Sequence, residues 1–600
     1  MKPIKLFIAT ITLQFFIAIL VLGQGTNNVI IDLSKEIYDD KIEVEILDLS
    51  FKNDRDTLFF PAVILGMYEE NNFGHYIEGV YATYQNGDVK KMKQKKKNLF
   101  ILKDAKQIKK ISYSVISAIQ DKTLFAPAAT YFDNNGAFLL NFHAIVGYSK
   151  STMNHPYAIT IKKHEDLIGV GALEKTNLEN LSSDIISAKN YHELIDSPFL
   201  YSKYEAQDTT EIQLNKGTVQ IAIAPNIYNI DADSIKEVIT PILNILENDS
   251  LFSTLFEGKY CLLFCFTDEY SPYSGALEHN KSSVYYFNDT IDFNYNLKEI
   301  VAHEILHILT PLNLRSERID SFDFINPIFS KHLWLYEGVT EYLAIKANFN
   351  ANLIDTSQFF RQLRMNYDFG KHADITSLTE FSENILNKKN QDNYGAIYTQ
   401  GAITAFYLDF LIAKESNGEQ GISDLLAYAM KSKSKGGIFN EETFFKDLES
   451  KFPIVKYFFE NMIISSNTYP FDEYMDELGV SFEQDTVQKK SPYLNYGIRR
   501  IDYRFQKYLF IKNQELNDSL EIKRLKIYEI NDKPVDYKST RILFSPQSNK
   551  PIKISIKQNF KSKTIEITPF LKEYSYYPIR LKIENNDNSV LKKVLSFGIE

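Results

Sequence analysis

The segment His303-Glu304-Ile305-Leu306-His307 constrains the fold of this chain more than any other feature. Residues four apart on an α-helix lie on one face, about one turn apart, so two imidazoles with this spacing can converge on one zinc ion. Glu304 then flanks the same position, where a carboxylate can take a proton from water. The apolar neighbours are typical of a buried helix, which we predict over Lys298 to Leu309. The alternative is an ordinary helix with two hydrogen-bonded histidines.

A catalytic zinc site needs a third protein ligand and an open position. Glu337 lies thirty residues after His307, inside a second predicted helix over Lys331 to Asn348. Glu341 follows one turn later, so both carboxylates could reach the same side. We take Glu337 as the third metal ligand and Glu341 as a partner of the site or a plain helix charge.

The two segments together resemble the glycyl aminopeptidase family of zinc metallopeptidases, which is related to thermolysin-type and leukotriene-hydrolase-type enzymes. That family carries a histidine-glutamate helix followed some 30 residues later by Trp-x-x-Glu-Gly-x-Thr. The positions that match are Trp334, Glu337, Gly338 and Thr340, and Trp334 is the single tryptophan of the chain. The resemblance covers most of residues 190 to 480. It departs after the second histidine, where the family commonly has Trp-Asn and this chain reads Ile308-Leu-Thr-Pro311.

The resemblance implies roles for two further residues. Glu278, in Gly275-Ala-Leu-Glu-His279, matches an edge strand that places a carboxylate where the free α-ammonium of a substrate sits. Tyr398, in Tyr398-Thr-Gln-Gly-Ala402, matches a segment whose tyrosine donates to the oxyanion of the tetrahedral intermediate, although Gln400 replaces the usual lysine. Tyr394 is a close competitor for this role.

Patterning along the chain predicts a multidomain α+β protein. Period-two alternation indicates a β-rich N-terminal domain over 25–190. Strands near 218–224, 260–266 and 283–287 and then longer helices indicate a mainly helical catalytic domain over 191–487, which the resemblance implies to be thermolysin-like. Short strands return over 488–600, and Leu525 to Val535 resembles part of a PDZ-like module.

The first 24 residues are typical of a secretory signal peptide, because Lys2 and Lys5 precede an apolar run from Leu6 to Leu22. An uncleaved membrane anchor is the alternative, and no other stretch is apolar enough to span a membrane. We expect export to the periplasm or the extracellular space. The net charge of −10 argues against a nucleic-acid partner.

These features lead us to expect an exported zinc aminopeptidase acting on peptides, with Glu304 as general base and Tyr398 as oxyanion donor. The resemblance implies a preference for small N-terminal residues, glycine or alanine. One alternative is a zinc endopeptidase of the same fold. Another is a peptide-binding protein that acts through its PDZ-like module and carries a structural or inactive zinc site. The second is disfavoured because a structural site would close all four metal positions with protein ligands.

Overall fold

The chain forms two compact units in a computed structural model, Met1–Tyr474 with Asn585–Glu600, and Met475–Glu584. The predicted signal peptide lies outside the residues that the structure describes. These are residues 25–34, 41–47, 49–118, 121, 123–132, 136–176, 180–204, 207–225, 230–267, 275–288, 296–375, 377–432, 437–465, 470–484, 489–495, 498–504, 508–513, 525–534, 551–558, 561–567, 570–576, 579–584 and 587–597.

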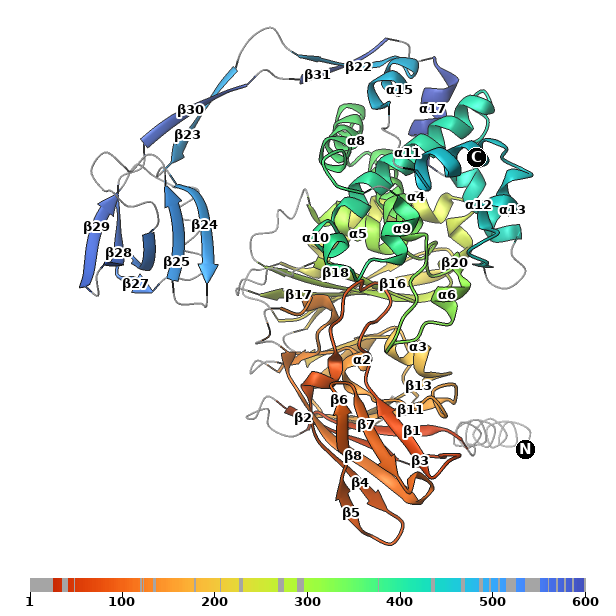
Figure 1. Ribbon diagram of the computed structural model, residues 1–600, viewed down its shortest axis with the longest axis vertical. Coiled ribbons are helices and arrows are strands. Elements are labelled where there is room, and N and C mark those ends of the chain that lie inside the picture. The colour runs from red at the N-terminus through yellow and green to blue at the C-terminus, as the bar shows by residue number, and fades with distance from the viewer. Residues whose placement is uncertain are drawn as a thin grey trace, which may run out of the picture. The chain divides into compact units, whose positions relative to one another are not determined.

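A seven-stranded sheet forms the largest part of the N-terminal region (Figure 1). Its strands, in spatial order, are β13 (Ser183–Ala188), β11 (Tyr157–Lys162), β1 (Asn27–Asp32), β2 (Lys41–Leu47), β8 (Ile108–Ile116), β4 (Ile77–Tyr84) and β5 (Val89–Lys91). β1 and β11 run parallel, and the other neighbours are antiparallel. Buried and more exposed side chains alternate along β2, as its period-two pattern predicts.

Two smaller sheets complete this region and confirm that it is β-rich. One contains β12 (Leu167–Gly171), β14 (Phe199–Lys203), β10 (Phe138–Leu140) and β9 (Tyr131–Phe132), and the other contains β3 (Arg55–Phe59), β7 (Leu99–Lys103) and β6 (Lys93–Lys96). Short helices connect them: η1 (Phe73–Tyr76), η2 (Ala105–Gln107), η4 (Ala126–Ala128), α2 (Phe142–Ile145) and α3 (Tyr191–Ile195). The segment between β3 and η1 leaves the sheets and reaches the candidate site.

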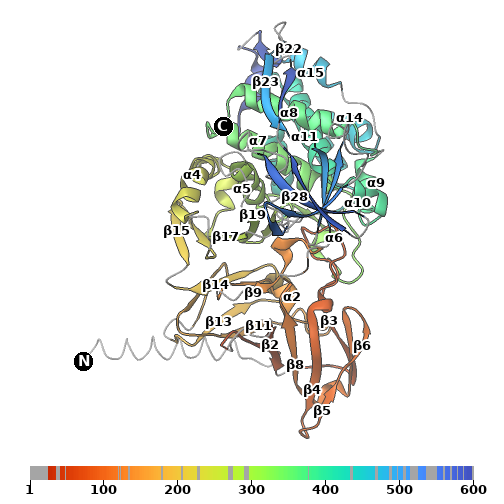
Figure 2. The same cartoon turned by 90° about the vertical axis from the view of Figure 1, so that its left-hand side faces the viewer.

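A five-stranded sheet follows, and its three predicted strands are confirmed. The order is β15 (Asp208–Gln213), β16 (Gly217–Ile223), β17 (Gly258–Thr267), β19 (Ser282–Asn288) and β18 (Gly275–His279). In both views this sheet lies between the helices and the N-terminal sheets (Figures 1 and 2). β18 runs antiparallel to β19 at the edge, so one side of its backbone is free to face a cavity.

The rest of the first unit is mainly helical. Its helices are α4 (Ala232–Asn248), η5 (Phe252–Thr254), α5 (Asn296–Leu306), α6 (Glu317–Asp320), η6 (Trp334–Val339), α7 (Thr340–Asn350), α8 (Thr356–Gly370), α9 (Leu378–Glu383), α10 (Lys388–Asp392), α11 (Ala396–Glu415), α12 (Ile422–Ser432), α13 (Phe444–Glu449), α14 (Ile454–Phe458), η7 (Phe459–Ile463), α15 (Phe471–Glu477) and α17 (Ser589–Leu595). The short strands β20 (Arg315–Ser316) and β21 (Ile438–Phe439) pair between them.

Helix α11 is the core of this helical part. Among the described residues it is the one helix long and apolar enough to cross a membrane, and 72% of its most apolar stretch is buried in the protein. Two glycines allow its backbone to touch η6, because a Cβ atom on Gly338 would lie 2.3 Å from the Cα of Gly401. A buried ion pair joins α11 to α7, with Lys346 Nζ 2.6 Å from Asp409 Oδ2.

The second unit consists mostly of strands, among which the predicted strands near 525–530 and 552–557 are confirmed. β22 (Val480–Gln484) pairs with β31 (Ile579–Ile583), and β23 (Lys489–Asn495) pairs with β30 (Phe570–Tyr576). The remaining sheet contains β24 (Ile498–Arg504), β25 (Tyr508–Asn513), β26 (Leu525–Ile530), β27 (Lys533–Pro534), β28 (Ile552–Gln558) and β29 (Lys561–Ile567). A PDZ-like fold for this unit stays a prediction.

The observed units differ from the expected domains at the C-terminus. We expected the last module to span 488–600, whereas residues Asn585–Glu600 belong to the first unit. The Nδ2 of Asn350 donates to the backbone oxygen of Leu595 at 2.8 Å, which holds the end of α17 against α7. The second unit is therefore an insertion within the first.

Candidate metal centre and cavity

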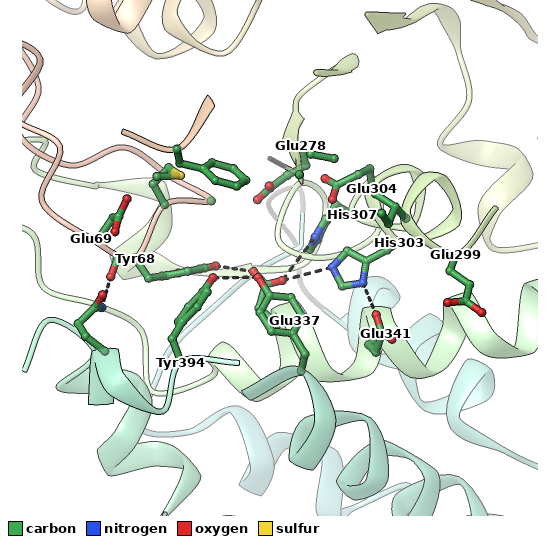
Figure 3. A pocket seen from close by; sticks show the side chains of 18 residues that line it. Tyr68, Glu69, Glu278, Glu299, His303, Glu304, His307, Glu337, Glu341 and Tyr394 are labelled. Atoms are coloured by element: carbon green, nitrogen blue, oxygen red, sulfur yellow. Dashed lines mark hydrogen bonds and ion pairs between the residues drawn. The ribbon is translucent and has the colours of Figure 1, made fainter. Parts of the chain in front are cut away.

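His303, His307 and Glu337 converge in the first unit (Figure 3). Glu337 Oε2 lies 3.3 Å from His303 Nε2 and 3.7 Å from His307 Nε2. The three side chains are buried, and their nearest ligand atoms lie within 4.8 Å of one another. Two imidazoles and one carboxylate that meet at a point could hold a metal ion and leave a further position open.

Local structure explains this convergence. Helix α5 carries His303 and ends at Leu306, three residues earlier than predicted. The chain continues in tighter turns, because the N–H groups of Ile308 and Leu309 bond the carbonyls of Ile305 and Leu306. His307 lies in the following turn, and its backbone N–H still bonds the carbonyl of His303 at 3.3 Å. The second predicted helix begins as the π-helical turn η6, which contains Glu337, and continues as α7.

Further hydrogen bonds orient both imidazole rings. His303 Nδ1 lies 2.9 Å from Glu341 Oε2, and His307 Nδ1 lies 3.0 Å from the carbonyl oxygen of Thr310. An N–H at Nδ1 donates to these oxygens, so Nε2 of each ring, on the side of Glu337, is the nitrogen that can offer its lone pair to a metal ion. Glu341 therefore contacts the ring of His303 from behind, while Glu337 faces both rings.

The buried charges also fit a cation. Burial raises the pKa of Glu304 to about 8, although the charge of His303 opposes this shift. Burial lowers the pKa of His307 to about 4. One carboxylate oxygen of Glu304 is buried and has no hydrogen-bond partner among the described residues. Several carboxylates converging in a buried site are costly unless a positive charge compensates them, so these residues fit a metal ion.

A second set of metal-ligating groups, Glu278, Glu304 and His307, overlaps the first. Its ligand atoms also lie within 4.8 Å of one another. We favour the first set because it brings both imidazoles to one carboxylate oxygen, which is a common ligand set for catalytic zinc. Glu278 and Glu304 then remain available for substrate.

A cavity of about 580 Å³ opens beside these residues. Its walls come from the N-terminal segment, from the edge strand β18, and from helices α5, α7, α10 and α11 with the turns beside them. The lining residues are Gly66, Met67, Tyr68, Glu69, Phe125, Gly275, Ala276, Glu278, Glu299, Ile300, His303, Glu304, His307, Glu337, Glu341, Gln391, Tyr394 and Tyr398. The site residues proposed from sequence therefore all line one cavity.

Glu278 is only 8% exposed, and its carboxylate lies in the cavity wall next to Gly66. Burial raises its pKa well above the usual carboxyl range, and the charges of Glu337 and Glu304 add to this effect. A Cβ atom on Gly66 would lie 2.7 Å from Glu278 Oε2, and Gly66 has a φ of 75°. Only glycine fits here without strain.

Tyr394 and Tyr398 lie together on the opposite wall. Their hydroxyl groups are 2.8 Å apart, and the ring of Tyr398 lies 5.7 Å from the ring of His303. The structure thus brings both candidate oxyanion donors to the cavity, and geometry alone leaves the choice between them open.

Sequence reasoning missed the contribution of the N-terminal region to this cavity. Tyr68 donates its hydroxyl hydrogen to Glu337 Oε1 at 2.9 Å, across 269 residues of sequence. Gln391 donates to the backbone oxygen of Tyr68 at 2.5 Å. Neither residue belongs to a motif that the sequence analysis identified. Tyrosine occurs 38 times in the chain, so a single tyrosine gives no signal by itself.

Comparison with known families supports the relationship suggested by these motifs. Residues 30–203 match the family model of the peptidase M61 N-terminal domain, and residues 296–404 match that of the M61 glycyl aminopeptidase. Two segments of the chain thus match domain models of the M61 glycyl aminopeptidase family. The chain is therefore a metallopeptidase, and the resemblance found in the sequence is confirmed. None of the curated proteins compared with the chain matches it.

The chain was also compared with solved structures. An aminopeptidase N family protein from Idiomarina loihiensis has a TM-score of 0.70 at 18% identity, covering 95% of this chain and 100% of its own. An M1 zinc metallopeptidase from Deinococcus radiodurans has a TM-score of 0.46 at 10% identity, covering 75% and 95%. Yeast LTA4 hydrolase in complex with bestatin has a TM-score of 0.46 at 12% identity, covering 74% and 68%. The chain thus shares its fold with the first of these.

Proposed function

We propose that this M61 peptidase is an exported zinc aminopeptidase that removes N-terminal glycine or alanine from peptides. One observation carries the proposal: the carboxylate of Glu278 lies in the same buried cavity as the convergent His303, His307 and Glu337. A metal site cleaves amide bonds, and an anionic group at a fixed place beside it selects a charged N-terminus. The preference for small residues rests on the family's glycyl activity.

His303 Nε2, His307 Nε2 and Glu337 Oε2 would hold the zinc ion. When bound, zinc supplies a Lewis acid that polarises a carbonyl and acidifies water. Glu304 lies in the same cavity, and its buried carboxylate oxygen has no partner among the described residues. We assign it as the general base that takes a proton from the attacking water and passes it to the departing amine.

Tyr398 donates a hydrogen bond to the oxyanion that forms on the scissile carbonyl. Tyr394 holds the Tyr398 hydroxyl at 2.8 Å and is the nearest substitute. Glu278 accepts hydrogen bonds from the α-ammonium of the substrate, which fixes the scissile bond one residue from the N-terminus.

Export is supported by the leader over residues 1–24, where Lys2 and Lys5 precede the apolar run.

The deciding experiment compares free and N-acetylated glycyl and alanyl substrates, with the metal content measured on the same protein. We expect about one zinc per chain and strong discrimination against the acetylated substrates. A charge-assisted contact is worth about 1.5 to 3 kcal/mol, so Glu278→Ala should cost roughly 10- to 200-fold in kcat/KM on free substrates.

The combined change separates an aminopeptidase from an endopeptidase. Glu278→Ala and substrate acetylation remove the same contact, so together they should cost much less than the product of the two single losses. Glu299→Ala is a matched control, because Glu299 lines the same cavity and should leave the discrimination intact. Rapid cleavage of acetylated peptides by the unchanged protein would establish the endopeptidase instead.

A further inference from the structure

The N-terminal region supplies a side chain that contacts a candidate metal ligand. Tyr68 lies between β3 and η1 and is 6% exposed. Its hydroxyl donates to Glu337 Oε1 at 2.9 Å, and the two side chains meet in the wall of the cavity (Figure 3). The other hydrogen-bond partners described for the three ligands, Glu341 and the carbonyl of Thr310, come from the catalytic part of the chain, so Tyr68 is a contribution from a separate region of sequence.

The two oxygens of Glu337 have different partners. Oε1 accepts the hydrogen bond from Tyr68, while Oε2 lies 3.3 Å from His303 Nε2 and 3.7 Å from His307 Nε2. A hydrogen bond on one oxygen of a metal-binding carboxylate fixes the rotation of the group and leaves the other oxygen to the metal. Tyr68 therefore determines which oxygen of Glu337 faces the imidazoles.

Tyr68 is itself held in place by the helical part of the unit. Gln391 in α10 donates to the backbone oxygen of Tyr68 at 2.5 Å and to that of Ile385 at 2.8 Å. The Tyr68 ring packs against Tyr394 and Phe329, with ring centroids 5.9 and 6.2 Å apart. Both the backbone and the ring are thus fixed, so the hydroxyl has a defined position when it meets Glu337.

We propose that Tyr68 is a positioning residue for the metal, which makes the N-terminal β-rich region a structural part of the metal centre. The inference rests on the proposed zinc site. Partners of this kind, which hydrogen-bond a metal ligand, typically contribute 10- to 100-fold to metal affinity. The region would then be required for metal binding itself, besides forming one wall of the cavity.

The test measures zinc affinity of the full-length protein by competition with a chromophoric chelator of known affinity. Tyr68→Phe removes one hydroxyl and should weaken zinc binding by about 10- to 100-fold. Tyr76→Phe is the matched control, because Tyr76 also donates to a carboxylate, Asp121 Oδ2 at 2.6 Å, away from the cavity. It should bind zinc as the unchanged protein does.

Two further measurements distinguish a role of Tyr68 in positioning the metal ligand from a general role in stability. With Co²⁺ in place of zinc, the visible absorption spectrum should change in Tyr68→Phe and stay the same in Tyr76→Phe. Excess zinc should restore most of the kcat of Tyr68→Phe with little change in KM. If Tyr68→Phe does not fold, Gln391→Ala, which frees the Tyr68 backbone, should weaken zinc binding in the same direction by a smaller factor.

Equal zinc affinity and an identical Co²⁺ spectrum in Tyr68→Phe and the unchanged protein would overturn the inference. Such a result would leave the proposed function intact, since the zinc site would still bind. If the unchanged protein bound no zinc with His303, His307 and Glu337 intact, the proposed function would fail, and the role of Tyr68 would fail with it.

Discussion

Three of the six glutamates that line the cavity are proposed site residues, and their surroundings shift their pKa values differently. Burial would raise the pKa of Glu337, but the charge of His307 and the hydrogen bond from His303 hold it below the usual range. Burial raises the pKa of Glu304 to about 8, and burial together with the charges of Glu337 and Glu304 raises the pKa of Glu278 well above the usual carboxyl range. The carboxylate that faces both imidazoles is thus the one whose pKa is lowered, which suits a metal ligand, because a ligand must be ionised to bind.

Glu304→Gln should abolish turnover and keep the metal. The amide preserves the shape of the side chain but cannot accept a proton from water. His303→Ala, by contrast, should lose the metal because it removes a ligand. Metal analysis and peptide hydrolysis on the same preparations check both expectations, and a Glu304→Gln protein with more than a small fraction of the normal rate would contradict the general-base role.

Tyr398→Phe should lower kcat by roughly 10²-fold or more with little change in KM, because the hydroxyl acts on a charge that exists only in the transition state. Tyr394→Phe removes the group that holds the Tyr398 hydroxyl and should have a smaller effect. Steady-state kinetics of the two variants decide the assignment. A normal kcat in Tyr398→Phe, together with a low kcat in Tyr394→Phe, would transfer the role to Tyr394.

At the residue level, the sequence predicted contacts that a short motif encodes. His303 and His307 are four residues apart, so helical geometry was sufficient to predict that they meet. The Glu337 segment was found from its distance along the sequence, which is typical of the family. Tyr68 was out of reach because its contact with Glu337 spans 269 residues and depends on how the N-terminal sheets pack on the helical part. A single sequence contains no record of such a contact.

At the level of elements, close packing explains why the segments of Glu337 and Tyr398 each contain a glycine. Gly338 follows Glu337 in η6, and Gly401 lies in α11 just after Tyr398. A Cβ atom on Gly338 would lie 2.3 Å from the Cα of Gly401. The two backbones therefore touch between the proposed metal ligand and the proposed oxyanion donor, and the glycines allow the close approach of the two elements that carry them.

Gly338→Ala should consequently destabilise the protein and reduce activity. Forcing a methyl group into a packed contact costs about 1 to 3 kcal/mol, and here the strain falls next to Glu337. Thermal unfolding and kcat/KM measure the two effects. Gly395→Ala is the control, because a Cβ atom there meets nothing within 4 Å. A Gly338→Ala protein with normal stability and activity would show that the contact is not restrictive.

Element boundaries were less predictable than element types. Three strands of the five-stranded sheet and the two helices of the site were expected, because hydrophobic periodicity identifies them. The sequence did not predict that η6 is a π-helical turn or that α5 ends at Leu306. Both are changes in the backbone hydrogen-bond pattern within an apolar segment, and periodicity does not describe them.

For the whole molecule, the unexpected feature is the return of the C-terminus. Helix α17 has the buried side chains Leu591 and Val594 and belongs to the first unit. Lys593 pairs with Asp424 at 3.2 Å, and the ring of Phe597 lies 5.5 Å from that of Phe252. A seven-residue amphipathic helix after a long β-rich segment gives no indication in sequence of where it packs.

This return leads to a prediction about two deletions. Truncation after residue 584 removes α17 and exposes the surfaces it covers, while excision of residues 481–582 keeps α17. Val480 and Ile583 are antiparallel partners, so neighbouring backbones there lie about 5 Å apart and two or three glycines can join them. Burying Leu591 and Val594 is worth about 1.5 to 3 kcal/mol each, so truncation should destabilise the first unit by about 3 to 6 kcal/mol.

Excision should leave the chemistry unchanged, because every residue that lines the cavity lies between 66 and 398. We expect the excised protein to hydrolyse glycyl and alanyl substrates with a normal kcat/KM, and the truncated one to unfold at a markedly lower temperature. Thermal unfolding and hydrolysis of small amino-acyl substrates check both. If the excised protein folded but lost activity on these substrates, the inserted unit would have to act directly on catalysis. The expectation that the first unit alone carries the activity would then be wrong.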